Sequence, residues 1–364
     1  MIEKYSNNKV DAYQYFALVV FLSRSMFTGM GAQNMIEMSR NDTWVSLLIG
    51  FCIGMPLVLL ICYINSKEIN MFELINKYFS KVISKIINFI IVLVLIFVLV
   101  IILNDFINFS NIKYLFETPN IFITILFIFP ILFIIKKGPE VMGRTALFLF
   151  FLTSVIIFLN SVGLIKYVNF DNLKPVFSTN IFSLFKSSLY YIAYAITPVI
   201  FLSIIPKEKN HSKKYNKALI IGYIFSFVAT FIAIFYVTTL FNVEYVTLFN
   251  YPTYFALKKI KYGFISNAEN ILSFYFIVDY FFTILVFLYS IFYYLSTELK
   301  LREKPLKITS ILITTIIVLI TNYAYKSTTI AQIVSKTPYI IVSLLFICSY
   351  LLLVTLKIRF CKKH

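Results

Sequence analysis

The sequence predicts an all-α integral membrane protein with ten transmembrane helices, on three observations. Ten apolar stretches are each long enough to cross a bilayer, which takes about 20 residues of helix. Hydrophobic residues make up 60% of the chain and charged residues 13%, whereas soluble domains average roughly 45–50% and 25%. Runs such as 86–103 are apolar on every side, so they are helices and not the alternating strands of a membrane barrel.

The expected spans follow one another along the chain, separated by short polar loops. They cover residues 12–34, 42–64, 85–104, 120–135, 145–166, 184–205, 216–241, 269–296, 307–325 and 338–357. We expect one membrane domain over residues 1–364, with a first five-helix half in 12–166 and a second in 184–357. Because each half has an odd number of spans, the halves have opposite orientations, which predicts a five-plus-five inverted repeat.

The loop charges orient these spans. The chain carries a net charge of +17, and about two thirds of its lysines and arginines fall on the side that holds both termini, which the positive-inside rule makes the cytoplasm. Loop 206–217 is then inside and loop 242–268 outside. The basic residues lie in separate loops between the spans and not along one face of a soluble domain, which argues against nucleic-acid binding. Segment 1–11 is polar and the first apolar run is too long for a signal peptide, so we expect an uncleaved first span.

Spans one and six carry helix breakers at corresponding positions. In span one, Gly29 and Gly31 permit close approach and non-helical backbone. In span six, Pro198 lacks a backbone donor and biases Thr197 away from the helical region. We expect helices one and six to be discontinuous, because transporters with inverted repeats bind their ligands between such broken helices. The alternative is ordinary packing, since glycine and proline are common in membrane helices.

The N–H groups freed at these breaks would suit a ligand carboxylate, because a helix N-terminus carries a partial positive charge. The expected ligand-binding residues are those of the two breaks and two tyrosines that precede the second break. They are Thr28, Gly29, Met30, Gly31, Tyr190, Tyr191, Tyr194, Ala195, Ile196 and Thr197.

Four short phrases carry a family resemblance. They are NDTWVS at 41–46, KGPEVMGR at 137–144, NLKPV at 172–176, and YPT at 251–253 followed by GF at 263–264. In their order and spacing they resemble the spore germination permease family, the membrane B subunits of germinant receptors in endospore-forming bacteria. Two stretches depart from its pattern: 32–34 (AQN) lacks the usual proline, and 266–269 (SNAE) lacks the usual Glu-Arg.

The resemblance implies a fold of the amino acid–polyamine–organocation superfamily. It also implies a B subunit that binds a small, amino acid-like nutrient and triggers germination together with A- and C-type subunits, in the inner membrane of the spore. An amino acid or amine transporter of the same superfamily is the main alternative. A lipid-linked sugar flippase or polymerase is a weaker one.

Two ionisable residues lie near the centres of apolar spans, Arg24 in the first and Asp279 in the eighth. A charge at such a depth costs about 2.5–3.5 kcal/mol or more. Arg24 is about 18 Å into its span, too deep for its side chain to reach the surface. The resemblance implies that spans one and eight border one cavity, so we expect the two side chains to pair. The alternatives are span limits that differ by half a helix, or a backbone group as the partner of each side chain. Asn104 and Asp105, at the outer end of span three, are expected to be interfacial.

The inner loop between spans four and five holds Gly138, Glu140, Gly143 and Arg144. The glycines would allow a tight connection. On a helix, Glu140 and Arg144 would share a face, and such an exposed pair contributes a few tenths of a kcal/mol. The motif is either a gate strut that pairs with other inner loops or a local staple.

The sequence offers no catalytic or metal-binding pattern. Its histidines are His211 and His364, and its four cysteines lack metal-ligand spacing. It also lacks a phosphate-binding glycine loop and a nucleophile elbow. We therefore expect a protein that is not an enzyme and that has no cofactor and no metal.

Overall fold

The computed structural model describes residues 9–208, 210–260, 268–324 and 333–360. Regular structure in these ranges is helical, apart from one isolated bridge between Val10 and Lys207. The α-helices are α2 (Ala12–Thr28), α3 (Met30–Ser39), α4 (Thr43–Asn65), α5 (Met71–Tyr78), α6 (Lys81–Lys113), α7 (Asn120–Lys137), α8 (Pro139–Leu164), α9 (Ile181–Ile200), α10 (Ser212–Leu240), α11 (Val243–Val246), α12 (Pro252–Leu257), α13 (Ala268–Leu272), α14 (Phe274–Thr297), α15 (Glu303–Leu319) and α17 (Thr337–Phe360). The 3-10 segments are η1 (Arg40–Asp42), η2 (Ile165–Tyr167), η3 (Phe170–Leu173) and η4 (Phe201–Ile204), and η5 (Ile320–Ala324) is π-helical.

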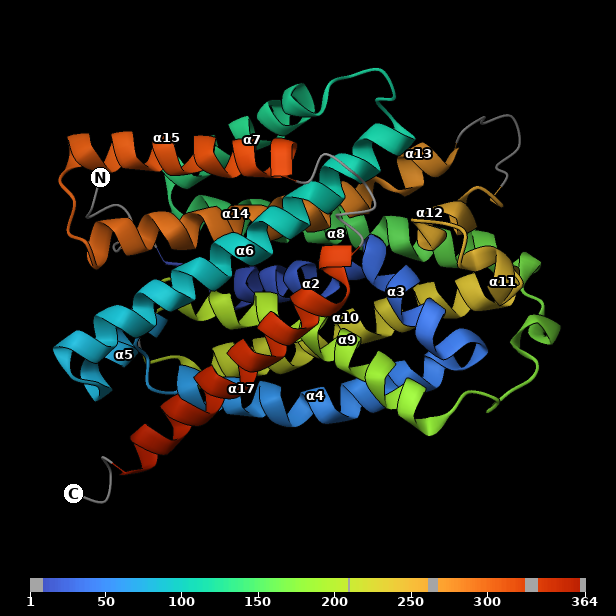
Figure 1. Cartoon of the computed structure of the whole chain (residues 1–364), viewed down its shortest axis with the longest axis horizontal. Helices are drawn as coiled ribbons and strands as arrows, with labels where there is room; N and C mark the ends of the chain where they lie inside the picture. Colours follow the sequence, from blue (N-terminus) through green and yellow to red (C-terminus); the bar gives the residue numbers. More distant parts are fainter. Residues whose placement is uncertain (1–8, 209, 261–267, 325–332, 361–364) are drawn as a thin grey trace.

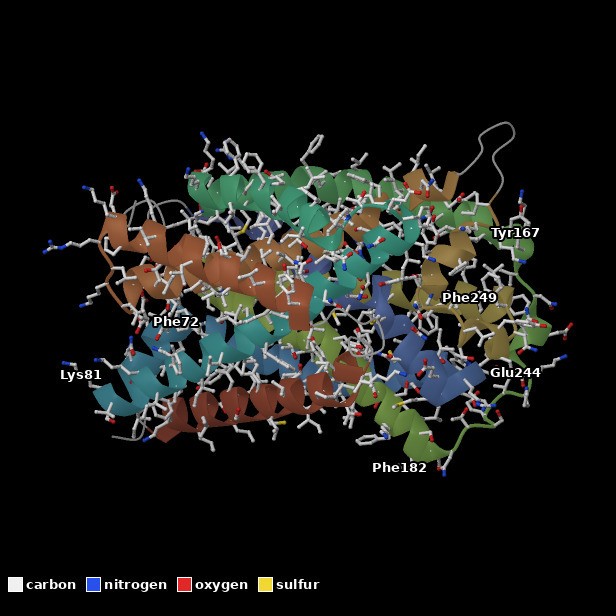
Figure 2. All side chains as sticks on the ribbon, turned by 45° about the horizontal axis from the view of Figure 1, so that its top comes forward. Phe72, Lys81, Tyr167, Phe182, Glu244 and Phe249 are labelled. Carbon is white, nitrogen blue, oxygen red and sulfur yellow. The ribbon has the colours of Figure 1, made fainter. Side chains whose placement is uncertain are left out.

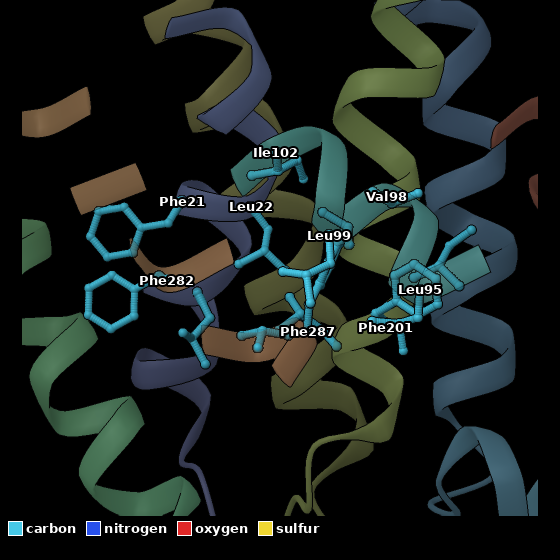
Figure 3. Packing of buried hydrophobic residues seen from close by; sticks show 14 of the residues in the cluster. Phe21, Leu22, Leu95, Val98, Leu99, Ile102, Phe201, Phe282 and Phe287 are labelled. Carbon is cyan, nitrogen blue, oxygen red and sulfur yellow. The ribbon is translucent and has the colours of Figure 1, made fainter. Parts of the chain in front are cut away.

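Helix α2 lies in the middle of the bundle and packs against α8, α9, α10 and α14 (Figure 1). Its polar side chains Ser23, Arg24 and Ser25 are buried, and inside a membrane such side chains need surrounding helices, because lipid cannot pair with them. Figure 3 shows Phe21 of α2 against Phe282 of α14, with ring centroids 4.8 Å apart. Leu99 and Ile102 of α6 extend the same core.

The peripheral helices expose large apolar side chains. Phe129 of α7, Phe148 and Phe158 of α8 and Ile311 of α15 are each about two-thirds exposed or more. Figure 2 shows these outer faces covered mostly by carbon, with Lys81 and Glu244 near opposite ends of the bundle. Because soluble proteins rarely expose apolar surface on this scale, the belt is lipid-facing, and the chain is a multi-pass membrane protein.

The all-α membrane fold is confirmed, with one difference in the count of spans. Within the described residues, nine helical segments are long and apolar enough to cross a membrane. The expected span that is missing from this count is span one. The break at Gly29 divides it into α2, of 17 residues, and α3, of 10 residues. Helix α3 then continues through η1 into α4. The first helix is therefore discontinuous, as predicted.

Helix six differs from the prediction. Helix α9 is continuous through Tyr194 and Thr197 and changes to 3-10 geometry only at Phe201, three residues after Pro198. The predicted break in helix six is therefore wrong, since residues 181–204 form one helical span. A proline disturbs the hydrogen bonds of the turn before it, but the packed neighbours hold that turn helical.

Two other helix boundaries differ from those expected from the sequence. Helix α6 runs to Lys113, well past the expected end at residue 104, which places Asn104 and Asp105 inside a helix. The loop expected at 136–144 contracts to Gly138, because α7 ends at Lys137 and α8 begins at Pro139. Gly138 has φ 103°, a conformation that favours glycine.

Helix α10 separates the two loops to which the charge pattern assigns opposite sides of the membrane. It begins at Ser212 and reaches α11 and α12 at the other end of the bundle (Figure 1). In a background with the native cysteines replaced by serine, we expect an impermeant maleimide to label Lys259→Cys in intact cells and to spare Lys213→Cys. Labelling of position 213 from outside would reverse the orientation.

Candidate functional site

The break in the first helix depends on two glycines. Gly29, with φ −104° and ψ −133°, ends α2 and precedes α3. A Cβ atom on Gly29 would lie 2.0 Å from both Oδ2 of Asp105 and Oη of Tyr280, and one on Gly31 would lie 2.4 Å from the carbonyl oxygen of Met26. Neither position has room for a side chain. Gly29 thus allows α6 and α14 to reach the backbone of the broken helix, and Gly31 allows α3 to lie close to the last turns of α2.

Asp105 of α6 occupies the start of α3. Its carboxylate accepts a hydrogen bond from the backbone N–H of Met30 at 3.3 Å, from the hydroxyl of Tyr280 at 2.7 Å and from that of Tyr251 at 3.2 Å. A negative charge there is favoured by the dipole of α3. The expectation that Asp105 and Asn104 are interfacial is wrong, since only 2% and 4% of their surfaces are exposed.

Tyr194 joins the broken helix to α9 and to the chain near α17. Its hydroxyl accepts a hydrogen bond from Nδ2 of Asn34 at 2.8 Å and donates to the carbonyl of Ser335 at 2.9 Å. Its ring lies 5.1 Å from that of Tyr339. Asn34 lies in 32–34, where the chain departs from the family pattern, so this departure provides a contact of the site.

The other predicted residues of helix six are buried but face different neighbours. Tyr191 packs beside Phe27 and against Gly50 of α4, and the side chain of Ile196 lies near Gly54 of the same helix. Tyr190 lies beside Tyr194. Ala195 and Thr197 are buried, and Oγ1 of Thr197 has no hydrogen-bond partner among the described residues. Since α9 stays helical here, its N–H groups are used within the helix.

The structure thus gathers Gly29, Met30, Gly31 and Tyr194 around the break, and it turns Tyr191 and Ile196 toward α4. The side chain of Thr28 lies outside the described residues. Sequence reasoning missed Asp105, Tyr251 and Tyr280. The available signal was an aspartate at the edge of an apolar span, which the misplaced span boundary hid.

Arg24 and Asp279 lie together in the centre of the bundle. Nε and Nη2 of Arg24 donate to Oδ2 and Oδ1 of Asp279 at 2.8 and 2.6 Å, and the side chains are 3% and 0% exposed. The rings of Phe21 and Tyr275 lie 5.8 and 5.6 Å from the guanidinium carbon. Such a two-point contact is the strongest geometry for this type of pair.

A small cavity adjoins this pair. It measures about 40 Å³ and is lined by Arg24, Tyr275, Asn160 and Thr230 among others. Oδ1 of Asn160 and Oγ1 of Thr230 are buried without a hydrogen-bond partner in the described part of the chain. The volume is the space open to the centre of a water molecule, of which each water needs roughly 10–15 Å³. The cavity therefore has room for a few waters, which would form hydrogen bonds with these two atoms.

Three of the four phrases make contacts at the site or at the end of the bundle that holds α11 and α12. Nδ2 of Asn41 donates to the carbonyl of Lys174, and the carboxylate of Asp42 accepts from the backbone of Phe177 and Thr179. The phrase at 251–253 supplies Tyr251 to Asp105. Gly263 and Phe264, and residues 266 and 267, lie outside the described residues.

The remaining phrase, at 137–144, joins α7 to α8. A Cβ on Gly143 would lie 2.5 Å from Oε1 of Gln14, so this glycine lets α8 approach the start of α2. Glu140 and Arg144 form an ion pair at 2.5 Å, with Arg144 71% and Glu140 36% exposed. The pair is therefore within one helix and largely in solvent.

Because of that exposure, we expect Arg144→Ala to lower the free energy of unfolding by less than about 0.5 kcal/mol. Gly143→Leu, which conflicts with Gln14, should cost about 1–3 kcal/mol. Thermal unfolding of the two purified variants would measure this difference. A large loss in Arg144→Ala would instead favour a gate strut with partners beyond Glu140.

Lys207, in the connection between α9 and α10, predicts a pH dependence. Its Nζ donates to Oδ1 of Asn65 at 2.8 Å and lies 4.8 Å from the ring of Tyr15. Burial lowers the pKa of Lys207 to about 7. In the unfolded chain Lys207 has the ordinary pKa of a lysine. Between about pH 7 and pH 10 the unfolded chain therefore binds more protons than the folded chain, so the free energy of unfolding should rise over this range. Lys207→Met should lose that rise, and unfolding midpoints at pH 6.5, 8 and 9.5 test it; equal pH profiles would contradict it.

The comparisons with known proteins concern both sequence and fold. Residues 9–327 match the family described as "Spore germination protein". Among solved structures, the chain is similar to a mutant of the manganese transporter of Eremococcus coleocola, with a TM-score of 0.58 and 12% identity over 98% of this chain and 81% of the other. At that identity the likeness shows the fold, which is that of a transporter. No curated protein sequence matches the chain.

Proposed function

Because the chain belongs to the spore germination protein family, we propose that it is the B-type membrane subunit of a germinant receptor in the inner membrane of the spore. In this proposal it binds a small, amino acid-like nutrient without catalysis and passes the signal to A- and C-type subunits. Both of its termini are in the cytoplasm. The break at Gly29 carries the proposal, since a broken helix in a transporter fold supplies a polar ligand site within the bundle.

Asp105 determines which end of such a ligand would enter the break. An amino acid carries an ammonium and a carboxylate group. The N–H of Met30 already donates to Asp105, so a ligand carboxylate would have to displace Asp105 or lie beside it, and juxtaposed like charges cost several kcal/mol. A ligand ammonium could instead replace the hydroxyl donors of Tyr251 and Tyr280. We therefore propose that Asp105 binds the ammonium group.

Matched probes test this orientation. The purified protein is screened by thermal shift with the standard amino acids, and each one that binds is compared with its decarboxylated amine and its deaminated acid. For L-alanine these are ethylamine and propionate. We expect the amine to retain binding and the acid to lose it. Asp105→Asn should weaken the binding of both the amino acid and its amine by at least about tenfold, since a hydrogen bond to a charged group contributes about 1.5–3 kcal/mol. Retained binding by Asp105→Asn, or tighter binding of the acid, would contradict the proposal.

A transporter of the same superfamily is the second candidate, which the fold likeness favours. Two measurements separate it from a receptor. A receptor subunit should co-purify with A- and C-type subunits, and spores lacking it should fail to germinate on the nutrient. A transporter should accumulate labelled nutrient in proteoliposomes that contain this chain alone.

A further inference from the structure

A lateral groove opens between α7, α14 and α15. Its volume is about 470 Å³. Its floor is apolar, with Ile135, Phe292 and Leu306 all nearly inaccessible to solvent. Its walls include Phe129 and Ile311, which are 73% and 66% exposed. The groove therefore belongs to the lipid-facing surface and is separate from the break at Gly29.

The walls are two matching helical stripes that both include a lysine. On α7 the lining residues are Phe129, Leu132, Phe133 and Lys136, and on α15 they are Lys307, Ser310, Ile311 and Thr314. Spacings of three and four residues put each set on one face of its helix. Lys136 lies at the last turn of α7 and Lys307 near the first turns of α15. Each stripe runs about 10 Å from its lysine into the membrane belt.

Charge complementarity identifies the occupant. Both lysines are exposed, and the lining includes no carboxylate among the residues that the structure describes. We propose that this groove binds an anionic phospholipid, with its phosphate at Lys136 and Lys307 and an acyl chain along the apolar floor. Basic pockets between transmembrane helices suit such head groups. An apolar helix of a partner would offer neither ammonium group a counter-charge, and the carboxylate of Glu303, which lies near Lys307 one turn earlier in α15, does not line the groove.

Native mass spectrometry of the full-length, detergent-purified protein tests this site. The probes are phosphatidylglycerol and phosphatidylcholine with identical acyl chains. We expect phosphatidylglycerol to bind in preference. Lys136→Ala/Lys307→Ala should weaken it by about tenfold or more, since each lysine near a phosphate contributes about 1 kcal/mol. The matched control, Lys213→Ala/Lys217→Ala, removes two exposed lysines of α10 that do not line the groove and should bind as the native protein does.

A second variant examines the apolar part of the site. Ser310→Trp would fill the groove without changing its charge and should also displace phosphatidylglycerol. Equal binding of the two lipids by the native protein, or unchanged binding by the double lysine variant, would mean an unspecific lipid shell and overturn the proposal. A dimer without bound lipid, dissociated by Ser310→Trp, would overturn it in favour of a second copy of the chain.

Discussion

Gly29→Leu should reduce the nutrient response by at least about tenfold while the protein remains in the membrane. Even the first carbon of the new side chain would conflict with Asp105 and Tyr280, each at 2.0 Å. Separating α6 and α14 from the break would remove the bond from Met30 to Asp105 and the geometry that holds a ligand. Overpacking typically costs about 1–3 kcal/mol, so a response reduced by at least about tenfold is expected.

Spore germination on the nutrient and the amount of protein in the membrane fraction are the two measurements. The control is Gly163→Leu, because Gly163 is a half-exposed glycine of α8, and this variant should respond normally. A normal response in Gly29→Leu at a normal protein level would move the ligand site away from the break.

Removal of either partner of the Arg24–Asp279 pair should be the most destabilising charge change in the bundle. Arg24→Met or Asp279→Leu alone would leave an uncompensated charge where the native side chains are 3% and 0% exposed, which commonly costs about 3–5 kcal/mol. The double variant leaves no charge, so it should be less damaged than either single variant.

Thermal unfolding of the purified variants completes a double-mutant cycle. The pair Asp171–Lys174, whose side chains are 75% and 72% exposed, is the control, and its removal should change the free energy of unfolding by less than about 1 kcal/mol. If the double variant at positions 24 and 279 were as damaged as the sum of the singles, the two charges would be uncoupled.

Much of the fold could be predicted because its causes are local in the sequence. Apolar length and composition identify the membrane helices whatever their neighbours are. Gly29 and Gly31 indicated the break in helix one because the backbone freedom of glycine needs no partner to be recognised. Arg24 and Asp279 were singled out by the cost of a charge in an apolar span, although their pairing was expected only from the family resemblance.

Helix six shows where such local reasoning fails. Pro198 predicted a break, but α9 stays helical through it and passes into a 3-10 turn only at Phe201, at the end of the span. Whether a proline opens the turn before it depends on the neighbours of that turn. Here Tyr194 is held by Asn34 and by the carbonyl of Ser335, contacts that span more than a hundred residues of sequence.

Taken by itself, the sequence determined that this is a membrane helix bundle with a broken first helix and two charges in its centre, because burial cost and backbone freedom are properties of single residues and short segments. The packing of the helices was needed to learn that Asp105 fills the break, that Tyr251 and Tyr280 complete its hydrogen bonds, and that Lys136 and Lys307 share a groove. Each of these depends on how far α6 extends or on how α7, α14 and α15 pack. Packing brings together residues that are far apart in the sequence, and no local pattern marks them as neighbours.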